Sequence, residues 1–252
     1  MEIMEKSMGR AVIFDLYETL ITENHPEWHV EAPTPGERLG LALGDCEREW
    51  STRYQARMTG KLRHYSDVLR EMCCACQIVP PEEEIALMQA KRLAAKARPF
   101  ERMDPLVVQT LHALKGAGYR IGLITDCAYD EIAAWDSSEL AVQVDVPIFS
   151  CVEGLIKPDP AIYELACDRL GVDVSDAVFV GDGGSDELRG ADAVGLKTIW
   201  ATWYIETWPW DWVGNIAKTS EGFPRCRMIS SPNIPCESPP VRAVLLGPPL
   251  VS

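Results

Sequence analysis

Long apolar stretches are missing from this 252-residue sequence, and basic side chains are scarce. No run approaches the about 20 apolar residues that span a bilayer as a helix, and residues 1–10 lack the apolar core of a signal peptide. With 24 Lys and Arg against 38 Asp and Glu, the formal net charge is −14. Such a chain repels nucleic acid and anionic lipid. We therefore expect a soluble, cytoplasmic protein without nucleic-acid or membrane partners.

Paired metal-ligand spacing is also missing, although the sequence has nine cysteines. The close cluster is Cys73, Cys74 and Cys76, and structural zinc needs a second ligand pair that none of the four histidines obviously supplies. Without a secretion signal, we expect reduced thiols. The favoured interpretation is that these cysteines pack as small apolar side chains of a helix, with a metal knuckle as the alternative.

Three short apolar runs of β-strand character each end on an aspartate: Asp15, Asp126 and Asp182. In an open α/β sheet, ligands bind beyond the carboxyl ends of the strands. Carboxylates gathered there predict a cation site, with Asp15 available as a nucleophile. The alternative is that one or two of them only cap turns or helices.

The pattern between these runs divides the chain. Residues 23–99 show helix formers and no strand pattern, which predicts an all-helical insertion. From residue 100 to 212, helices alternate with strands, which predicts βαβ units and a doubly wound parallel sheet. The predicted organisation is an α/β core of residues 1–22 and 100–212, a helical cap of residues 23–99, and a proline-rich, loosely ordered tail of residues 213–252.

Five tryptophans lie between residues 200 and 212. Large aromatic side chains dominate cores and subunit contacts, so the stretch predicts one of these roles, with ligand stacking as the alternative. A homodimer through this stretch or through the tail is a further expectation.

Four short motifs occur in an order that resembles the haloacid dehalogenase (HAD) superfamily of hydrolases. Three lie at or just past a predicted strand end, which makes the set more specific than any one motif. The resemblance covers residues 10–203 and implies a Rossmann-like α/β core with an inserted α-helical cap. The motifs are Asp15-Leu-Tyr-Glu-Thr-Leu20, Thr125 after a strand, Lys157-Pro-Asp-Pro160 and Gly181-Asp-Gly-Gly-Ser-Asp186.

The resemblance implies roles for these residues. Asp15 would attack phosphorus and form an aspartyl-phosphate, while Lys157 neutralises the transferring oxygens and Thr125 donates a hydrogen bond. Mg²⁺, a hard ion that prefers oxygen, would be the cofactor. Its predicted ligands are Asp15, the backbone carbonyl of Tyr17, Asp182 and, directly or through water, Asp186.

A small anionic molecule is the expected substrate. We expect contacts from Thr19 and Asp126 in the core and from Arg53 and Arg57 in the cap. Two further cap cations, Arg48 and Lys61, have the same potential. The alternative for these four cations is a solvated helix face.

The first and fourth motifs favour different activities. Tyr17 stands where most phosphatases of the family carry a second aspartate, and 2-haloacid dehalogenases, which need no metal, have Asp-x-Tyr there. The fourth motif has the metal-binding form typical of phosphatases. We weigh the fourth motif more heavily and predict a Mg²⁺-dependent phosphatase acting on a small phosphomonoester. A haloacid dehalogenase and a non-catalytic binding protein are the alternatives, and either Tyr17 or Glu18 replaces the missing acid.

Overall fold

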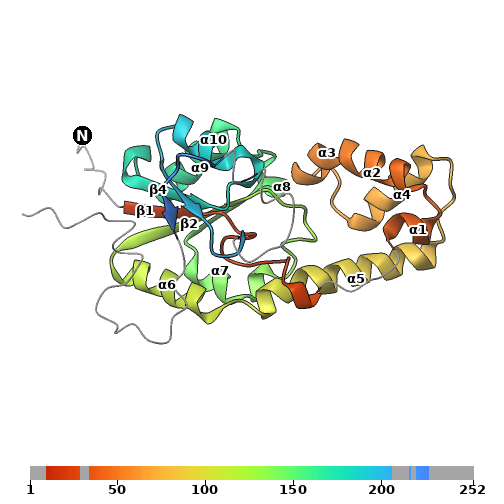
Figure 1. The fold of residues 1–252 in the computed structure, drawn as a ribbon, viewed down its shortest axis with the longest axis horizontal. Coiled ribbons are helices and arrows are strands. Elements are labelled where there is room, and N and C mark those ends of the chain that lie inside the picture. The colour runs from red at the N-terminus through yellow and green to blue at the C-terminus, as the bar shows by residue number, and fades with distance from the viewer. Residues whose placement is uncertain (1–9, 29–33, 206–215, 217–219, 227–252) are drawn as a thin grey trace, which may run out of the picture.

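The computed structural model describes residues 10–28, 34–205, 216 and 220–226 (Figure 1). Its centre is a six-stranded parallel sheet with the strand order β3-β2-β1-β4-β5-β6, which confirms the predicted doubly wound α/β core. The strands are β1 (Arg10–Phe14), β2 (Tyr119–Thr125), β3 (Val146–Phe149), β4 (Ala177–Gly181), β5 (Lys197–Ala201) and β6 (Arg225–Cys226).

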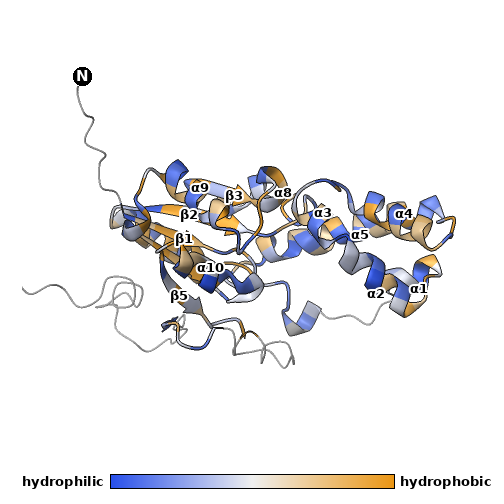
Figure 2. Cartoon of the chain, turned by 90° about the horizontal axis from the view of Figure 1, so that it is seen from above, coloured by the Kyte–Doolittle hydropathy of each residue, from blue (hydrophilic) through white to orange (hydrophobic). Residues whose placement is uncertain are grey.

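Helices cover both faces of this sheet. Alternate residues of β1 point to opposite faces, so Val12 and Phe14 join one apolar cluster while Ala11 and Ile13 join the other. Figure 2 shows the resulting apolar strands between more polar helices. The core helices are α6 (Pro105–Gly116), α7 (Glu139–Gln143), α8 (Ser150–Glu153), α9 (Pro160–Leu170) and α10 (Glu187–Ala193), with short 3₁₀ turns η2 (Trp135–Ser137), η3 (Val174–Asp176) and η4 (Gly184–Asp186).

A helical cap stands between β1 and β2 in the chain and extends to one side of the core (Figure 1). Its own apolar cluster contains Leu69 and Ile85, which are fully buried. The predicted boundary at residue 99 falls inside the longest helix, α5, whose Phe100 packs into the core cluster. The cap elements are η1 (Pro26–Trp28), α1 (Pro35–Leu39), α2 (Leu43–Thr52), α3 (Tyr54–Met58), α4 (Tyr65–Ala75) and α5 (Glu82–Glu101).

Part of the predicted loose tail is ordered instead. Arg225 and Cys226 form β6, which pairs in parallel with β5 at the edge of the sheet. The Trp200 N–H of β5 donates to the carbonyl oxygen of Pro224 at 2.8 Å, which satisfies a backbone group that would otherwise stay unpaired. Of the tryptophan-rich stretch, Trp200 is buried in the core, as expected, and residues 206–215 lie outside the described part of the chain.

Two of the three cysteines in the cap cluster pack against its apolar core, whereas Cys74 is exposed. Cys73 is fully buried in the cap cluster, and Cys76 packs against it. Cys73, Cys74 and Cys76 are free thiols. Among the described residues, the group close enough to hold a metal ion does not include them. In the same described ranges, no helix is long and apolar enough to cross a membrane.

One close contact between cap and core depends on a glycine. Gly60, just after α3, has a left-handed φ of 73°. A Cβ placed on it would lie 1.9 Å from the carbonyl oxygen of Cys151 in α8. No side chain fits at that separation, so α3 reaches the core only because residue 60 is glycine.

Gly60→Ala is therefore expected to push α3 away from α8, and to lower both the melting temperature and the catalytic efficiency. Gly40→Ala is the matched control, because Gly40 has a φ of 72° but nothing within 4 Å of its ideal Cβ. The control carries only the left-handed backbone cost of about 1 kcal/mol. Thermal unfolding and initial rates of both variants provide the measurement. Equal losses in the two variants would show that this contact has no role in closing the cap.

Candidate active site

Three buried carboxylates meet at the carboxyl edge of the sheet. Asp15 directly follows β1 and Asp182 directly follows β4, and these two strands are paired neighbours. Glu187 opens α10 behind them. One carboxylate oxygen from each lies within 4.8 Å of the others. Parallel strands bring their carboxyl ends to the same edge, so residues far apart in sequence converge there.

Lys157 supplies the positive charge of this cluster. Its Nζ lies 2.6 Å from Asp15 Oδ1 and 2.5 Å from Glu187 Oε2, and the lysine itself is buried. The Lys157 backbone N–H donates to Asp126 Oδ1 at 2.9 Å, so Asp126 holds the lysine's loop beside the end of β2. The Gly183 N–H donates to Glu187 Oε1 at 2.9 Å and fixes the glutamate from the other side.

The charges of this cluster do not balance. Burial raises the pKa of Asp15 to about 7, and Glu187 adds to the shift while Lys157 opposes it. Burial, together with the charge of Asp15, raises the pKa of Asp182 to about 7, and burial has the same effect on Glu187. One lysine cannot neutralise three ionised carboxylates in a buried site. A divalent cation that prefers oxygen ligands would remove the excess charge, so the donor set fits Mg²⁺.

These pKa values make Mg²⁺ affinity depend on pH, because a ligand must lose its proton before it binds metal. We expect Mg²⁺ binding to be at least about tenfold weaker near pH ~5.5 than near pH ~8.

The folded pKa values of these carboxylates, about 7, exceed their ordinary values of 3.8 for aspartate and 4.5 for glutamate. The folded state therefore binds more protons than the unfolded state between these values. As a result, the free energy of unfolding of the metal-free protein decreases as the pH rises through about 7. Calorimetric titration and thermal unfolding, with chelator and with Mg²⁺, measure both effects. A pH-independent affinity would contradict the assignment.

The structure places the two adjacent acidic residues of the fourth motif, Asp186 and Glu187, in different surroundings. Asp186, the predicted ligand, is exposed and has its carboxylate 3.7 Å from Arg189. Ser185 and Asp186 both adopt left-handed conformations, with φ of 52° and 55°. This turn directs Asp186 outward and brings Glu187 into the cluster. The sequence shows that two acidic residues, Asp186 and Glu187, are adjacent. Which of the two joins the cluster depends on the backbone conformation of the turn.

Two more of the predicted core residues, Thr125 and Asp126, lie at the same edge, at the end of β2. Thr125 ends β2 and is buried, and Thr19 is fully buried. The Thr19 hydroxyl and Asp126 Oδ2 have no hydrogen-bond partner among the described residues. Buried polar atoms of this kind are usually satisfied, so these two are available to a ligand.

Tyr17 and Glu18 differ in what their side chains do. The Tyr17 hydroxyl donates to the carbonyl oxygen of Glu131 at 2.7 Å, and burial raises its pKa above the ordinary value. Its proton is therefore engaged by the backbone. Glu18 has a φ of 59°, and burial raises its pKa to about 7. Glu18 Oε1 accepts from Glu23 and Asn24, while Oε2 is buried without a partner among the described residues.

The cap cations fall into two groups. Arg53 pairs with Glu49 at 2.7 Å and Glu71 at 3.2 Å, so its guanidinium is occupied within the cap. Arg48 is likewise paired with acidic neighbours, and Lys61 is exposed. Arg57 is buried, and no ion pair joins it to a carboxylate among the described residues. Among the described residues, Arg57 and Lys61 are thus the two of the four cations without an ion pair, and Arg57 is the buried one.

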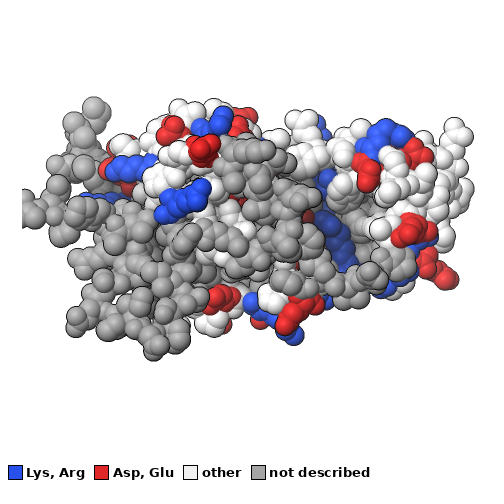
Figure 3. Space-filling view, in the orientation of Figure 1, with Lys and Arg blue, Asp and Glu red and all other residues white. Residues whose placement is uncertain are grey.

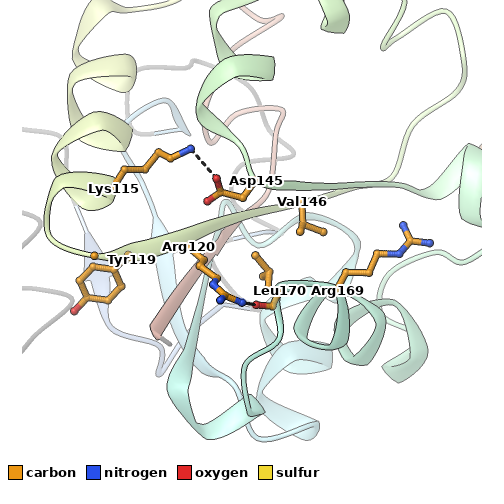
Figure 4. Close-up of a pocket in the computed structure, with 8 residues that line it drawn as sticks. Lys115, Tyr119, Arg120, Asp145, Val146, Arg169 and Leu170 are labelled. Atoms are coloured by element: carbon orange, nitrogen blue, oxygen red, sulfur yellow. Dashed lines mark hydrogen bonds and ion pairs between the residues drawn. The ribbon is translucent and has the colours of Figure 1, made fainter. Parts of the chain in front are cut away.

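A depression lies at the opposite edge of the sheet, where β2 and β3 begin (Figure 4). Lys115 Nζ lies 2.7 Å from Asp145 Oδ1, and Arg120 donates to the carbonyl oxygen of Leu170. Its cations are thus engaged, and the three-carboxylate group does not extend to it. The candidate catalytic residues lie at the carboxyl edge of the sheet instead.

This chain is similar to known proteins in sequence and in fold. A family model described as haloacid dehalogenase-like hydrolase matches residues 10–195. The chain is 37% identical over 198 residues to (S)-2-haloacid dehalogenase 4A of Burkholderia cepacia, covering 75% of this chain and 81% of that protein. It is 35% identical over 105 residues to glyceraldehyde 3-phosphate phosphatase of Pyrococcus abyssi, covering 40% and 43%.

Some of these likenesses are partial. The chain covers 43% of the length of the Pyrococcus phosphatase and 18% of that of acyl-CoA dehydrogenase family member 10 of Mus musculus. A solved dehalogenase structure, 21% identical, superposes with a TM-score of 0.52 over 89% of this chain and 94% of that one, which shows the fold alone. The family match spans most of the chain and all the clustered residues. This protein therefore belongs to the haloacid dehalogenase-like hydrolases.

Proposed function

We propose that this hydrolase is a Mg²⁺-dependent phosphatase acting on a small phosphomonoester. The observation that carries the proposal is the group of three buried carboxylates, Asp15, Asp182 and Glu187, around one lysine. Carbon–halogen displacement by Asp15 needs no further carboxylates beside the nucleophile. Unneutralised, they raise its pKa and lower its ionised fraction at neutral pH. Binding of a cation by the three carboxylates would explain why they lie together.

The proposed reaction has two displacements at phosphorus. Lys157 holds Asp15 Oδ1 at 2.6 Å, and the other Asp15 oxygen attacks the phosphorus. A P–O bond forms to Asp15 while the ester P–O bond breaks, and the leaving alkoxide takes up a proton. Water then attacks the aspartyl-phosphate, which releases phosphate and restores the carboxylate.

The chain's own groups stabilise the charge that develops. Lys157 neutralises oxygen charge from a buried position, and the Thr125 and Thr19 hydroxyls supply donors. Glu18, whose pKa of about 7 suits a neutral-pH acid, is our candidate donor for the leaving oxygen. A bound Mg²⁺ would add neutralisation of the phosphoryl oxygens.

Two assays on one purified sample test this function. The first follows phosphate release from an aryl phosphate with Mg²⁺ and with chelator. The second follows halide release from 2-chloropropionate under the same conditions. Phosphate release that chelator abolishes supports the proposal. Halide release that ignores the chelator, without phosphate release, contradicts it.

A dehalogenase is the second candidate, favoured by the 37% identity to the Burkholderia enzyme and by Tyr17. In that reaction Asp15 would attack the halogen-bearing carbon, and halide would leave with the bonding electrons. Water would then hydrolyse the resulting ester. The three-carboxylate group is the feature that this candidate leaves unexplained.

Tyr17→Phe tests the role of the phenol. The phenolic proton is donated to Glu131 at 2.7 Å, so we expect phosphatase activity to stay within about threefold of wild type. Loss of this hydrogen bond should lower the free energy of unfolding by about 1 kcal/mol. Initial rates and urea unfolding measure the two effects. A loss of about a hundredfold or more would identify Tyr17 as the acid.

A further inference from the structure

The cap presents one helix face toward the catalytic cluster. Tyr54 and Arg57 are three residues apart in α3, so their side chains share a face. Burial and the carboxylate of Asp126 raise the pKa of the Tyr54 phenol, and hydrogen bonding to Ser185 and the charge of Lys157 oppose the shift. Asp126, Ser185 and Lys157 therefore lie close enough to influence the pKa of the Tyr54 phenol. Arg57 lies on the same face of α3 as Tyr54, one helical turn further along the chain.

Arg57 is an unusual cation for this cap. It is only 6% exposed, and its guanidinium carbon lies 3.6 Å from the centre of the Trp50 ring. Its hydrogen bond to the Trp50 carbonyl oxygen is long, at 3.4 Å, and its Nε is buried without a partner among the described residues. Burying a guanidinium without a hydrogen-bonded anion is costly, so the arrangement is incomplete as it stands.

The nearest carboxylates are engaged by other cations. Arg92 of α5 pairs with Asp130 and, at 3.0 Å, with Glu131. Lys96 of the same helix lies 2.9 Å from Glu131. These acids follow β2 in the core, and their charge acts on Arg57 although each of them is paired with another cation. Burial accordingly lowers the pKa of Arg57 despite their attraction.

The geometry around Arg57 suits a planar anion. Trp50 covers one face of the guanidinium, and the Tyr54 ring centre lies 5.8 Å away. A guanidinium held against an aromatic ring keeps its N–H edge fixed, which favours carboxylate and phosphate oxygens. On the face drawn in Figure 3, Lys or Arg atoms are visible between the core and the cap. An anion entering there would meet positive charge.

We propose that Arg57 binds a second anionic group of the substrate, a carboxylate or a phosphate on the same molecule as the phosphate that is cleaved. The substrate class is then a small phosphomonoester with an anionic tail. This inference rests on the proposed phosphatase function. It assigns the scissile phosphate to the carboxylate cluster and the tail to the cap.

Calorimetric titration of the Mg²⁺-loaded full chain tests the inference with ligands that a phosphatase does not cleave. The three-carbon ligands are 3-phosphonopropanoate, propane-1,3-diylbisphosphonate and propylphosphonate, which differ in the second group. We expect one or both of the first two to bind about tenfold to a hundredfold more tightly than propylphosphonate. Whichever of the two binds more tightly distinguishes a carboxylate tail from a phosphate tail.

Arg57→Met should remove this preference, so that the three ligands bind the variant with equal affinity. Arg57→Lys, which keeps the charge but loses the planar fork, should retain part of it. Arg70→Met is the matched control, since Arg70 is an exposed cap arginine paired with Asp67 and Glu82, and it should keep the full preference.

Two results would overturn the inference. Equal affinities of the wild type for all three ligands would do so, as would a preference that survives in Arg57→Met. Either result leaves the phosphatase proposal standing if Mg²⁺-dependent hydrolysis of an aryl phosphate is observed in the separate assay. Absence of both that hydrolysis and any phosphonate binding would overturn the function and the inference together.

Discussion

Asp15→Asn is expected to abolish phosphate release, with a loss of at least about a thousandfold in kcat/KM. An amide oxygen is a poor nucleophile, so the covalent intermediate cannot form. The fold should persist, because the amide has the shape of the carboxylate and lowers the number of charges in a crowded cluster. We expect a melting temperature equal to or above that of wild type.

Hydrolysis of an aryl phosphate at saturating Mg²⁺, together with thermal unfolding, measures both expectations. Asp136→Asn serves as the control, because Asp136 is exposed in η2 and does not belong to the three-carboxylate group. A variant of Asp15 that folds and still turns over at more than about a tenth of the wild-type rate would exclude it as the nucleophile.

Glu187→Gln and Asp186→Asn are expected to differ sharply, although the residues are adjacent. Glu187 is fully buried with its carboxylate 2.5 Å from Lys157 Nζ, whereas Asp186 is exposed. Neutralising Glu187 should lower activity about tenfold to a hundredfold and raise the Mg²⁺ concentration needed for half-maximal activity. Neutralising Asp186 should change either quantity by less than about twofold.

Mg²⁺ titrations of the initial rate in both variants provide the measurement. If Asp186→Asn raises the Mg²⁺ requirement while Glu187→Gln does not, the metal ligands are those expected from sequence spacing. The turn at Ser185 and Asp186 would then have to adopt another conformation when the metal binds.

Much of the core could be predicted because local patterns and global fold agree there. The apolar run ending at Asp15 is β1, and the runs ending near Asp126 and Asp182 are β2 and β4. Asp159 with Pro160 begins α9, as the capping pattern indicates. Between residues 129 and 137, in the part of the chain where helices alternate with strands, only the short η2 turn forms. That segment instead places Asp130 and Glu131 against the cap, a tertiary role without a local signal.

The sequence by itself determined the order of strands and helices, the carboxylates at the strand ends and the membership of the hydrolase family. Those features depend on periodicity and on residues next to one another in the chain. Only the tertiary structure decided that Glu187 joins Asp15 and Lys157, that the Tyr17 phenol binds Glu131, and that Arg57 remains unpaired by any carboxylate among the described residues. Each depends on backbone direction and on neighbours from distant segments, because a side chain's partner is chosen by where its Cα–Cβ bond points.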